Sequence, residues 1–212
     1  MNILLEDVQC KLYGLTDLSQ TQSNVSLSHG NPSFTTLGGV VCQRFTATSQ
    51  RLTGTLNGSL PAKNLSIEIW VYPETELQAD DRGCMFRIGG GSAAYMSWNK
   101  TNATLSNYWY NHPTDGYWET GAAVNRNRWN CFTAVWNNYT GYLYQWTNGV
   151  KTTSTSTTIG NSAVGSTLEI GNEGGSSRQF AGGIGLIRVY NRALTDTQVL
   201  NNFNATRSRF GV

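Results

Sequence analysis

The chain has 212 residues, 13% of them charged and 11% aromatic, and its formal net charge is +2. This size and composition suit one turn-rich domain and exclude an intrinsically disordered chain. The near balance of 15 basic and 13 acidic residues, without a basic run, argues against a nucleic-acid partner.

The first 38 residues lack the patterning of the rest of the chain. Their apolar residues show no sustained period, and the stretch from Ser23 to Gly39 is rich in Ser, Thr, Gly and Asn. We predict an N-terminal arm or edge segment over 1–38, followed by one domain over 39–212. The alternative is that this segment holds the first strand of the domain.

The beginning of the chain has neither the basic nor the long apolar region of a secretory signal. No apolar run approaches the roughly 20 residues that cross a membrane as a helix, so we expect no membrane partner. Both features are expected of a protein made in the cytoplasm.

Short β-rich runs separated by turn residues begin at Val40. The clearest covers 65–72, where apolar residues alternate with a second set, so that the two sets occupy opposite faces of a strand. One face holds Leu65, Ile67, Ile69 and Val71, and the other holds Ser66, Glu68, Trp70 and Tyr72. Further strands are predicted at 40–47, 84–88, 107–111, 117–120, 129–136, 142–146, 150–153 and 167–171. Such spacing, with turns at 112–116, 137–141 and 148–149, indicates an all-β sandwich or barrel.

The segment from Phe180 to Gln198 predicts a buried strand followed by a capped helix. Glycines at 182, 183 and 185 allow the backbone to pass close to a neighbour, and 186–190 is a β-rich run. Thr195 and Gln198 fit a capping box, and Leu194 and Val199 fit the hydrophobic staple that accompanies it.

Several of these pieces resemble concanavalin A-like, laminin G-like jelly-roll domains. They are the strand at 65–73, the hairpin at 128–149, and the closing segments at 168–171, 180–183 and 187–194. The resemblance covers about residues 40–205. It implies an antiparallel two-sheet β-sandwich of the concanavalin A-like jelly-roll type with one short C-terminal helix. The family is mostly a binding and assembly fold, which implies a protein that is not an enzyme.

The last residues, 200–212, resemble the ending of such domains in structural proteins of tailed bacteriophages. This resemblance implies a non-enzymatic virion protein that decorates or cements the capsid or belongs to the tail. Its partners would be other virion subunits, as a homo-oligomer or with the capsid protein, and its location the virion. Because Arg and aromatic residues are enriched in interfaces, the candidate assembly residues are Arg192, Arg207, Arg209 and Phe210. Alternatively, both ends of the chain pack back on their own domain.

A second hypothesis is a carbohydrate-binding module that mediates adhesion to host or environmental glycans. Sugar binding needs flat aromatic faces with a few polar groups, and the hairpin over 107–119 supplies both. The candidate glycan-binding residues are Tyr108, Trp109, Tyr110, Asp115, Tyr117 and Trp118. Alternation places Trp109 on the opposite face from its two tyrosine neighbours, so only part of the set can face solvent. The competing interpretation is cross-strand aromatic packing.

No pattern of catalytic or cofactor-binding residues is visible. A glycosidase needs two carboxylates across the scissile bond, and no strand carries the alternating acidic run that would supply them. His29 and His112 have neither a metal-ligand spacing nor a nucleophile motif. We therefore expect no catalytic residues, no metal site and no cofactor. Calcium at the loop acids Asp80, Asp81, Asp115 and Glu173 is the alternative kept open.

The four cysteines are widely separated, at Cys10, Cys42, Cys84 and Cys131. None belongs to a C-x-x-C pair, which argues against zinc. We expect four reduced and mostly buried thiols, with a disulfide framework as the alternative.

Overall fold

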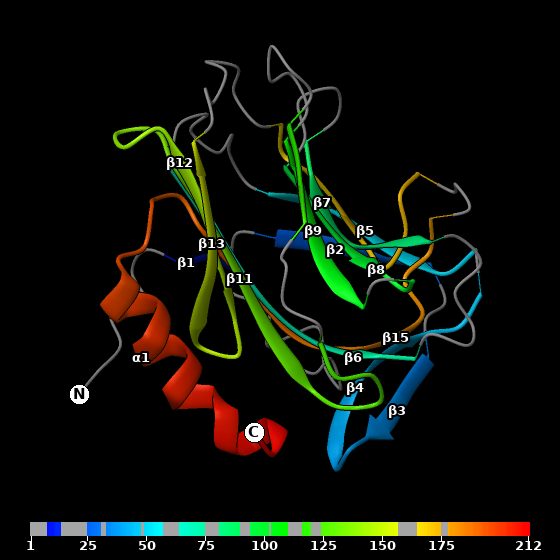
Figure 1. The fold of residues 1–212 in the computed structure, drawn as a ribbon. Coiled ribbons are helices and arrows are strands. Elements are labelled where there is room, and N and C mark those ends of the chain that lie inside the picture. The colour runs from blue at the N-terminus through cyan, green and yellow to red at the C-terminus, as the bar shows by residue number, and fades with distance from the viewer. Residues whose placement is uncertain are drawn as a thin grey trace.

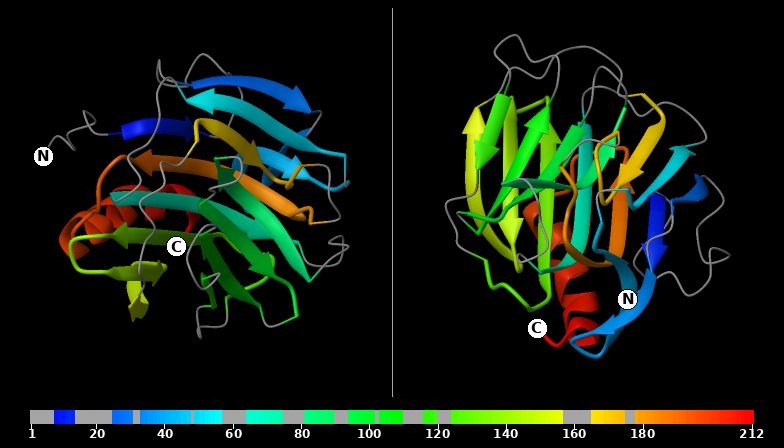
Figure 2. Two further views of the ribbon diagram at one scale, coloured as in Figure 1. Left: turned by 90° about the horizontal axis from the view of Figure 1, so that it is seen from above. Right: turned by 90° about the vertical axis from the view of Figure 1, so that its right-hand side faces the viewer.

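A computed structural model of the chain describes residues 8–13, 25–30, 33–47, 49–56, 64–74, 81–89, 94–101, 103–109, 116–119, 124–156, 165–174 and 178–212. They form two antiparallel β-sheets packed face to face, with one helix near the C-terminus on the outside of the first sheet (Figures 1 and 2). The predicted all-β sandwich with a short C-terminal helix is confirmed.

The first sheet has eight strands. In order they are β13 (Val150–Ser156), β12 (Tyr142–Thr147), β11 (Asn130–Asn137), β6 (Asn64–Pro73), β15 (Gly182–Tyr190), β4 (Val40–Phe45) and β3 (Ser33–Leu37), with β1 (Val8–Tyr13) also paired to β15. The second sheet has seven strands. Their order is β10 (Gly116–Glu119), β9 (Thr104–Trp109), β8 (Ala94–Asn99), β7 (Arg82–Ile88), β14 (Thr167–Ile170), β5 (Arg51–Leu56) and β2 (Val25–Gly30).

The described parts of residues 1–38 are strands of this sandwich. β2 lies at the edge of the second sheet, and β3 lies at the edge of the first. β1 pairs with the central strand β15 from Val8 to Tyr13. These strands are hydrogen-bonded into the same two sheets as the rest of the domain.

The space between the sheets is filled by one large apolar cluster. β6 places one of its two predicted faces there, with Leu65, Ile67, Ile69 and Val71 all fully buried. The second sheet contributes Phe86, Met96, Trp98, Leu168 and Ile170. The side chains of β6 therefore alternate as predicted from the sequence, and the face with the aliphatic residues points into the core between the sheets.

The opposite face of β6 is also buried, because the C-terminal segment covers it. Helix α1 (Asp196–Thr206) and the short 3₁₀ helix η4 (Arg207–Phe210) pack on the outer face of the first sheet (Figure 1). Trp70 stacks on Phe203 and Phe210, with ring centroids 5.7 and 4.2 Å apart and nearly parallel planes. A strand buried on both faces loses the polar-out pattern of an exposed sheet, which is why Trp70 can occupy this side.

The start of α1 has the predicted cap. The Thr195 hydroxyl accepts a hydrogen bond from the Gln198 backbone N–H, and the Gln198 side chain accepts one from the Thr195 N–H. Leu194 and Val199, the predicted staple, are both buried in one apolar cluster with Trp146 and Tyr190. The capping box is thus confirmed, and it fixes where the helix leaves β15.

Removing this cap should destabilise the protein modestly. We expect Thr195→Ala to lower the free energy of unfolding by about 0.5–2 kcal/mol, because the Gln198 backbone N–H in the first turn loses its acceptor. Thr197→Ala is the matched control, since Thr197 is exposed within the helix and takes no part in the cap. Urea denaturation of both variants measures the difference, and an equal effect of the two would refute the role of the cap.

Three cysteines are buried free thiols: Cys42, Cys84 and Cys131. Burial raises the pKa of the Cys42 thiol to about 12 and that of the other two well above the usual value. The side chain of Cys10 lies outside the described residues.

None of the described helices is long and apolar enough to span a membrane.

Candidate functional site

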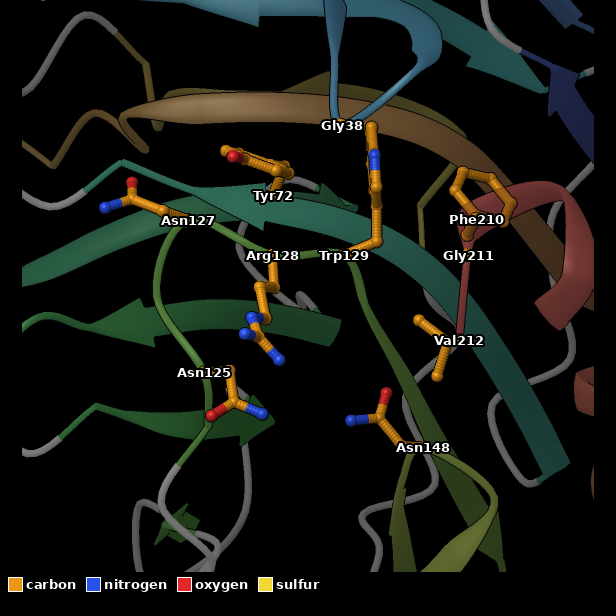
Figure 3. A pocket seen from close by; sticks show the side chains of 10 residues that line it. All are labelled: Gly38, Tyr72, Asn125, Asn127, Arg128, Trp129, Asn148, Phe210, Gly211 and Val212. Atoms are coloured by element: carbon orange, nitrogen blue, oxygen red, sulfur yellow. The ribbon is translucent and has the colours of Figure 1, made fainter.

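An open pocket of about 390 Å³ lies where the C-terminal residues meet the first sheet. Its walls come from the β3–β4 turn, β6, the loop before β11, the β12–β13 turn and the residues that follow η4. The lining residues are Gly38, Tyr72, Asn125, Asn127, Arg128, Trp129, Asn148, Phe210, Gly211 and Val212 (Figure 3). We call it the Arg128 pocket.

One buried asparagine builds much of this pocket. The Asn130 amide donates to the backbone carbonyl oxygens of Asn125 (2.8 Å) and Arg128 (2.9 Å), which closes the loop on itself. Its own oxygen accepts a hydrogen bond from the Asn148 amide at 3.3 Å, and the Asn148 oxygen accepts one from the Cys131 backbone N–H. The loop before β11 and the β12–β13 turn are therefore held together before any ligand arrives, as a binding site requires.

An aromatic wall stands on one side of the pocket. The Trp129 indole N–H donates to the Leu37 carbonyl oxygen at 2.8 Å, which fixes the ring beside the β3–β4 turn. Tyr72 meets Trp129 edge-on at 5.6 Å, and Phe210 packs against its other side at 4.9 Å. Trp129 and Phe210 are almost fully buried, whereas Tyr72 is partly exposed and offers ring surface to the pocket.

Polar side chains stand on the other side. Figure 3 shows the Arg128 guanidinium extending into the open space between the Asn125 and Asn148 amides, with Tyr72 and Trp129 above. Asn125, Asn127 and Arg128 are exposed, and none of their side chains forms a hydrogen bond or ion pair with another described residue. The pocket thus combines aromatic surface with hydrogen-bonding groups that are not used by the fold.

The closing glycines of β15 make room for the aromatic wall. A Cβ atom on Gly185 would lie 2.7 Å from the Phe210 ring and 3.0 Å from the Trp129 ring. A Cβ atom on Gly183 would lie 2.8 Å from the Cys42 sulfur. The prediction that these glycines permit close approach is confirmed, and the groups that approach are the side chains behind the Arg128 pocket.

The predicted glycan-binding residues belong to a different part of the fold. β9 and β10 pair as the predicted hairpin, with Tyr108 opposite Tyr117 and Trp118 opposite Asn107. The structure describes the backbone but not the side chains of four of these residues, Tyr108, Trp109, Tyr117 and Trp118. Tyr110 and Asp115 lie entirely outside the described residues. Their role in sugar binding stays a prediction.

Of the predicted assembly residues, Arg192 lies just before α1, whereas Arg207, Arg209 and Phe210 belong to η4. Arg207 and Arg209 are exposed, and each guanidinium lies near a ring of its own segment, Phe203 and Phe210 respectively. Arg192 is partly buried and donates to the Gln198 side chain at 2.9 Å. Phe210 packs inside its own domain, so of the four only the arginines present side-chain surface to a partner.

Two glutamates, one in β14 and one just after it, share an arginine partner. Glu169 and Glu173 both contact the Arg87 guanidinium, at 2.8 and 3.9 Å. Glu169 also contacts Arg51 at 3.4 Å, and Glu173 contacts Arg178 at 3.2 Å. Both carboxylates are thus held in ion pairs with arginines of their own domain.

The loop acids named for calcium have other partners where they are described. Asp81 accepts a hydrogen bond from the Thr101 hydroxyl at 2.7 Å, and Glu173 is bound by arginines. Asp80 and Asp115 lie outside the described residues. Within the described ranges, no group of three or more His, Cys, Asp or Glu side chains could hold a metal ion.

Another aromatic surface runs along β12. Tyr142 and Tyr144 stack at 5.8 Å, and Trp146 follows at 6.2 Å. Lys151 lies over the Tyr144 ring at 4.2 Å and is held there by Asp196. At the hairpin tip beside this row, Tyr139 is 90% exposed. Because Lys151 covers the middle ring, this row offers less free aromatic surface next to unused polar groups than the Arg128 pocket does.

Sequence analysis placed several of the pocket residues in predicted strands and turns but did not predict that they form a site. Arg128, Trp129 and Asn148 belong to the hairpin that carries the family resemblance, and Tyr72 belongs to the clearest strand. The loop Asn125-Arg-Asn-Arg128 before a tryptophan is a local signal, because four exposed polar residues precede a buried ring. Phe210 and Gly38 reach the pocket from distant parts of the chain, which no local pattern reveals.

Comparison with known proteins identifies the family. The chain matches the family model Laminin_G_3, described as the concanavalin A-like lectin/glucanases superfamily, over residues 46–200. No curated protein sequence matches the chain significantly.

Solved structures with the same fold include receptor-binding domains of clostridial toxins. The receptor binding domain of botulinum neurotoxin D is 14% identical, with a TM-score of 0.73 over 95% of this chain and 53% of that chain. The binding domain of Paraclostridial Mosquitocidal Protein 1 is 14% identical, with a TM-score of 0.75 over 94% of this chain and 52% of that chain.

A third structure contains a sugar. The botulinum neurotoxin serotype D ligand binding domain in complex with N-acetylneuraminic acid is 14% identical, with a TM-score of 0.73 over 94% of this chain and 51% of that chain. This chain spans about half the length of these solved chains, so the similarity does not place the sugar on the matched half. At this identity the similarity shows the fold alone.

The family match covers most of the chain, and the two-sheet sandwich agrees with it. The chain therefore belongs to the concanavalin A-like lectin/glucanase superfamily.

Proposed function

We propose that this protein is a carbohydrate-binding module that has no catalytic activity and holds a glycan in the Arg128 pocket. The observation that carries the proposal is the arrangement of that pocket: ring surface of Tyr72, packed on the buried Trp129, on one side, and the unused polar groups of Asn125, Asn127 and Arg128 on the other. Sugars present apolar C–H faces and a rim of hydroxyl groups, so both kinds of surface are needed to bind them.

Two further observations support the proposal. The family includes lectins as well as glucanases, and structures with the same fold are receptor-binding domains, one of them solved with a sugar. Glu169 and Glu173 are engaged by arginines of their own domain, and Glu68 and Glu74 likewise, which favours a lectin over a glucanase that needs a free pair of carboxylates.

The test is a glycan-array screen with the labelled protein, followed by titration of the best ligand. We expect Arg128→Gln to weaken binding at least tenfold and Asn125→Ala to weaken it by about 2- to 10-fold, because each removes hydrogen bonds to the sugar. Both residues are exposed, so neither change should disturb folding.

Two matched controls accompany these variants. Arg207→Gln removes an exposed arginine that does not line the pocket, and Tyr139→Ala removes an exposed aromatic ring at the far end of β11. Both should bind like the unmodified protein. If the controls weaken binding as much as the pocket variants do, or if no glycan binds, the proposal fails.

A structural role in a phage particle is a second proposal. What favours it is the outer surface of α1 and η4, on which Leu200, Arg207 and Arg209 are exposed. Neither of the reported toxin domains is a virion protein, so this role rests on that surface and on the sequence resemblance.

A further inference from the structure

The side chains that line the Arg128 pocket carry charge of one sign only. Among the residues that line the pocket, the charged side chain is that of Arg128. No aspartate or glutamate is among the described lining residues. Arg126 and Arg209 are exposed next to lining residues in the sequence. A pocket with a guanidinium and no acidic side chain favours a ligand that brings negative charge.

The nearest carboxylates along β6 are already neutralised. Glu74, two residues after Tyr72, receives hydrogen bonds from the Arg44 guanidinium at 2.8 and 2.9 Å. Glu68, on the same strand, is paired with Arg188 at 2.9 Å. Among the described residues, no carboxylate lies within ion-pair distance of Arg128, whose side chain lies in the pocket between the Asn125 and Asn148 amides in Figure 3.

The geometry points to an anionic group on a sugar ring, a carboxylate or a sulfate, as the part of the ligand that this pocket recognises. Arginine presents paired donors that match the two oxygens of such a group. Asn125 and Asn148 flank the guanidinium with amide groups that can contact ring hydroxyls, and Tyr72 supplies ring surface for the sugar face. This inference rests on the proposed carbohydrate-binding function and names the ligand class for the same site.

An isolated phosphate or a nucleic acid fits these features less well. Arg128 is the single charged side chain among the residues that line the pocket, and the sequence has no basic run of the kind that a polyanion backbone would need. The aromatic wall would contribute nothing to binding a free inorganic anion. A sugar acid or sugar sulfate uses both sides of the pocket.

The test compares matched pairs of sugars by calorimetric titration. The pairs are glucose with glucuronic acid, galactose with galacturonic acid, and galactose with galactose 6-sulfate, together with N-acetylneuraminic acid and inorganic sulfate alone. We expect at least one acidic member to bind about 10- to 100-fold more tightly than its neutral partner. The carboxylated and sulfated pairs show which of the two anions is preferred.

Three variants identify the group responsible. Arg128→Gln should abolish the preference for the acidic member of each pair. Arg128→Lys should keep part of this preference, because the positive charge remains but the paired donors are lost. Arg207→Gln should leave the preference unchanged. Raising the salt concentration should reduce the preference in the unmodified protein.

The outcomes separate this inference from the proposed function. Equal binding of acidic and neutral sugars, or a preference that persists in Arg128→Gln, would overturn the anionic-ligand inference and leave the carbohydrate-binding proposal intact. Inorganic sulfate that binds as tightly as the sugar acids would also overturn it, because the ring would then contribute nothing. Binding of none of the sugars would overturn both.

Discussion

Replacing Glu68 with leucine should lower the free energy of unfolding by about 3–5 kcal/mol, because it leaves the buried Arg188 guanidinium without an opposite charge. Glu68 on β6 and Arg188 on β15 are direct cross-strand neighbours, and Arg188 Nη1 donates to Glu68 Oε1 at 2.9 Å. Both lie on the outer face of the first sheet beneath the C-terminal segment, where Glu68 is 0% and Arg188 5% exposed. A guanidinium cannot lose its proton to escape this penalty.

The double variant Glu68→Leu/Arg188→Leu should recover most of the lost stability. Replacing a whole buried ion pair by apolar side chains is often neutral or stabilising, whereas removing one partner is costly. Asp196→Asn is the control for an exposed pair: it removes the partner of Lys151, 3.0 Å away, and should cost only about 1 kcal/mol. Urea denaturation of all variants makes the comparison. A double variant as unstable as the single one would contradict the account.

Phe210→Ala should also cost about 3–5 kcal/mol, although Phe210 lies only two residues before the last residue of the sequence. The ring is 2% exposed and is held between Trp70, 4.2 Å away, and Trp129, 4.9 Å away. Loss of the ring leaves a cavity against Trp70 and removes one wall of the Arg128 pocket. The same variant should therefore weaken glycan binding.

Gly185 provides the matched test of this packing. Gly185→Ala should cost about 1–3 kcal/mol, because its Cβ atom would lie 2.7 Å from the Phe210 ring. In the double variant Gly185→Ala/Phe210→Ala the methyl group enters the space that the ring has left. We expect its loss of stability to be smaller than the sum of the two single losses. Strict additivity in thermal or urea denaturation would mean that Gly185 and Phe210 do not share one contact.

The elements with a strong local pattern were predictable from the sequence. The alternating run in β6 and the capping box of α1 both depend on neighbours within a few residues, and both appear where expected. β8 (Ala94–Asn99) was missed, because every residue in it is buried and a strand covered on both faces has no alternation to detect. β5 was missed as well, since its polar threonines and its glycine resemble a loop.

The Arg128 pocket was not predictable in the same way. Its aromatic wall depends on Phe210 crossing the outer face of the sheet to reach Trp129, and its floor depends on Asn130 joining two loops. These are long-range contacts that follow from the packing of the C-terminal segment. The sequence does contain unusually polar residues before Trp129, but the same composition is ordinary for a turn.

The central claim is that glycans bind at the Arg128 pocket, and NMR chemical-shift mapping tests it most directly. The isotope-labelled protein would be titrated with the strongest glycan from the array, and the backbone amide shifts followed. The account predicts that the largest changes fall within 125–131, 147–149 and 210–212. Changes concentrated in the β9–β10 hairpin, with these amides unmoved, would contradict it and place the sugar on the aromatic residues of 107–119 instead.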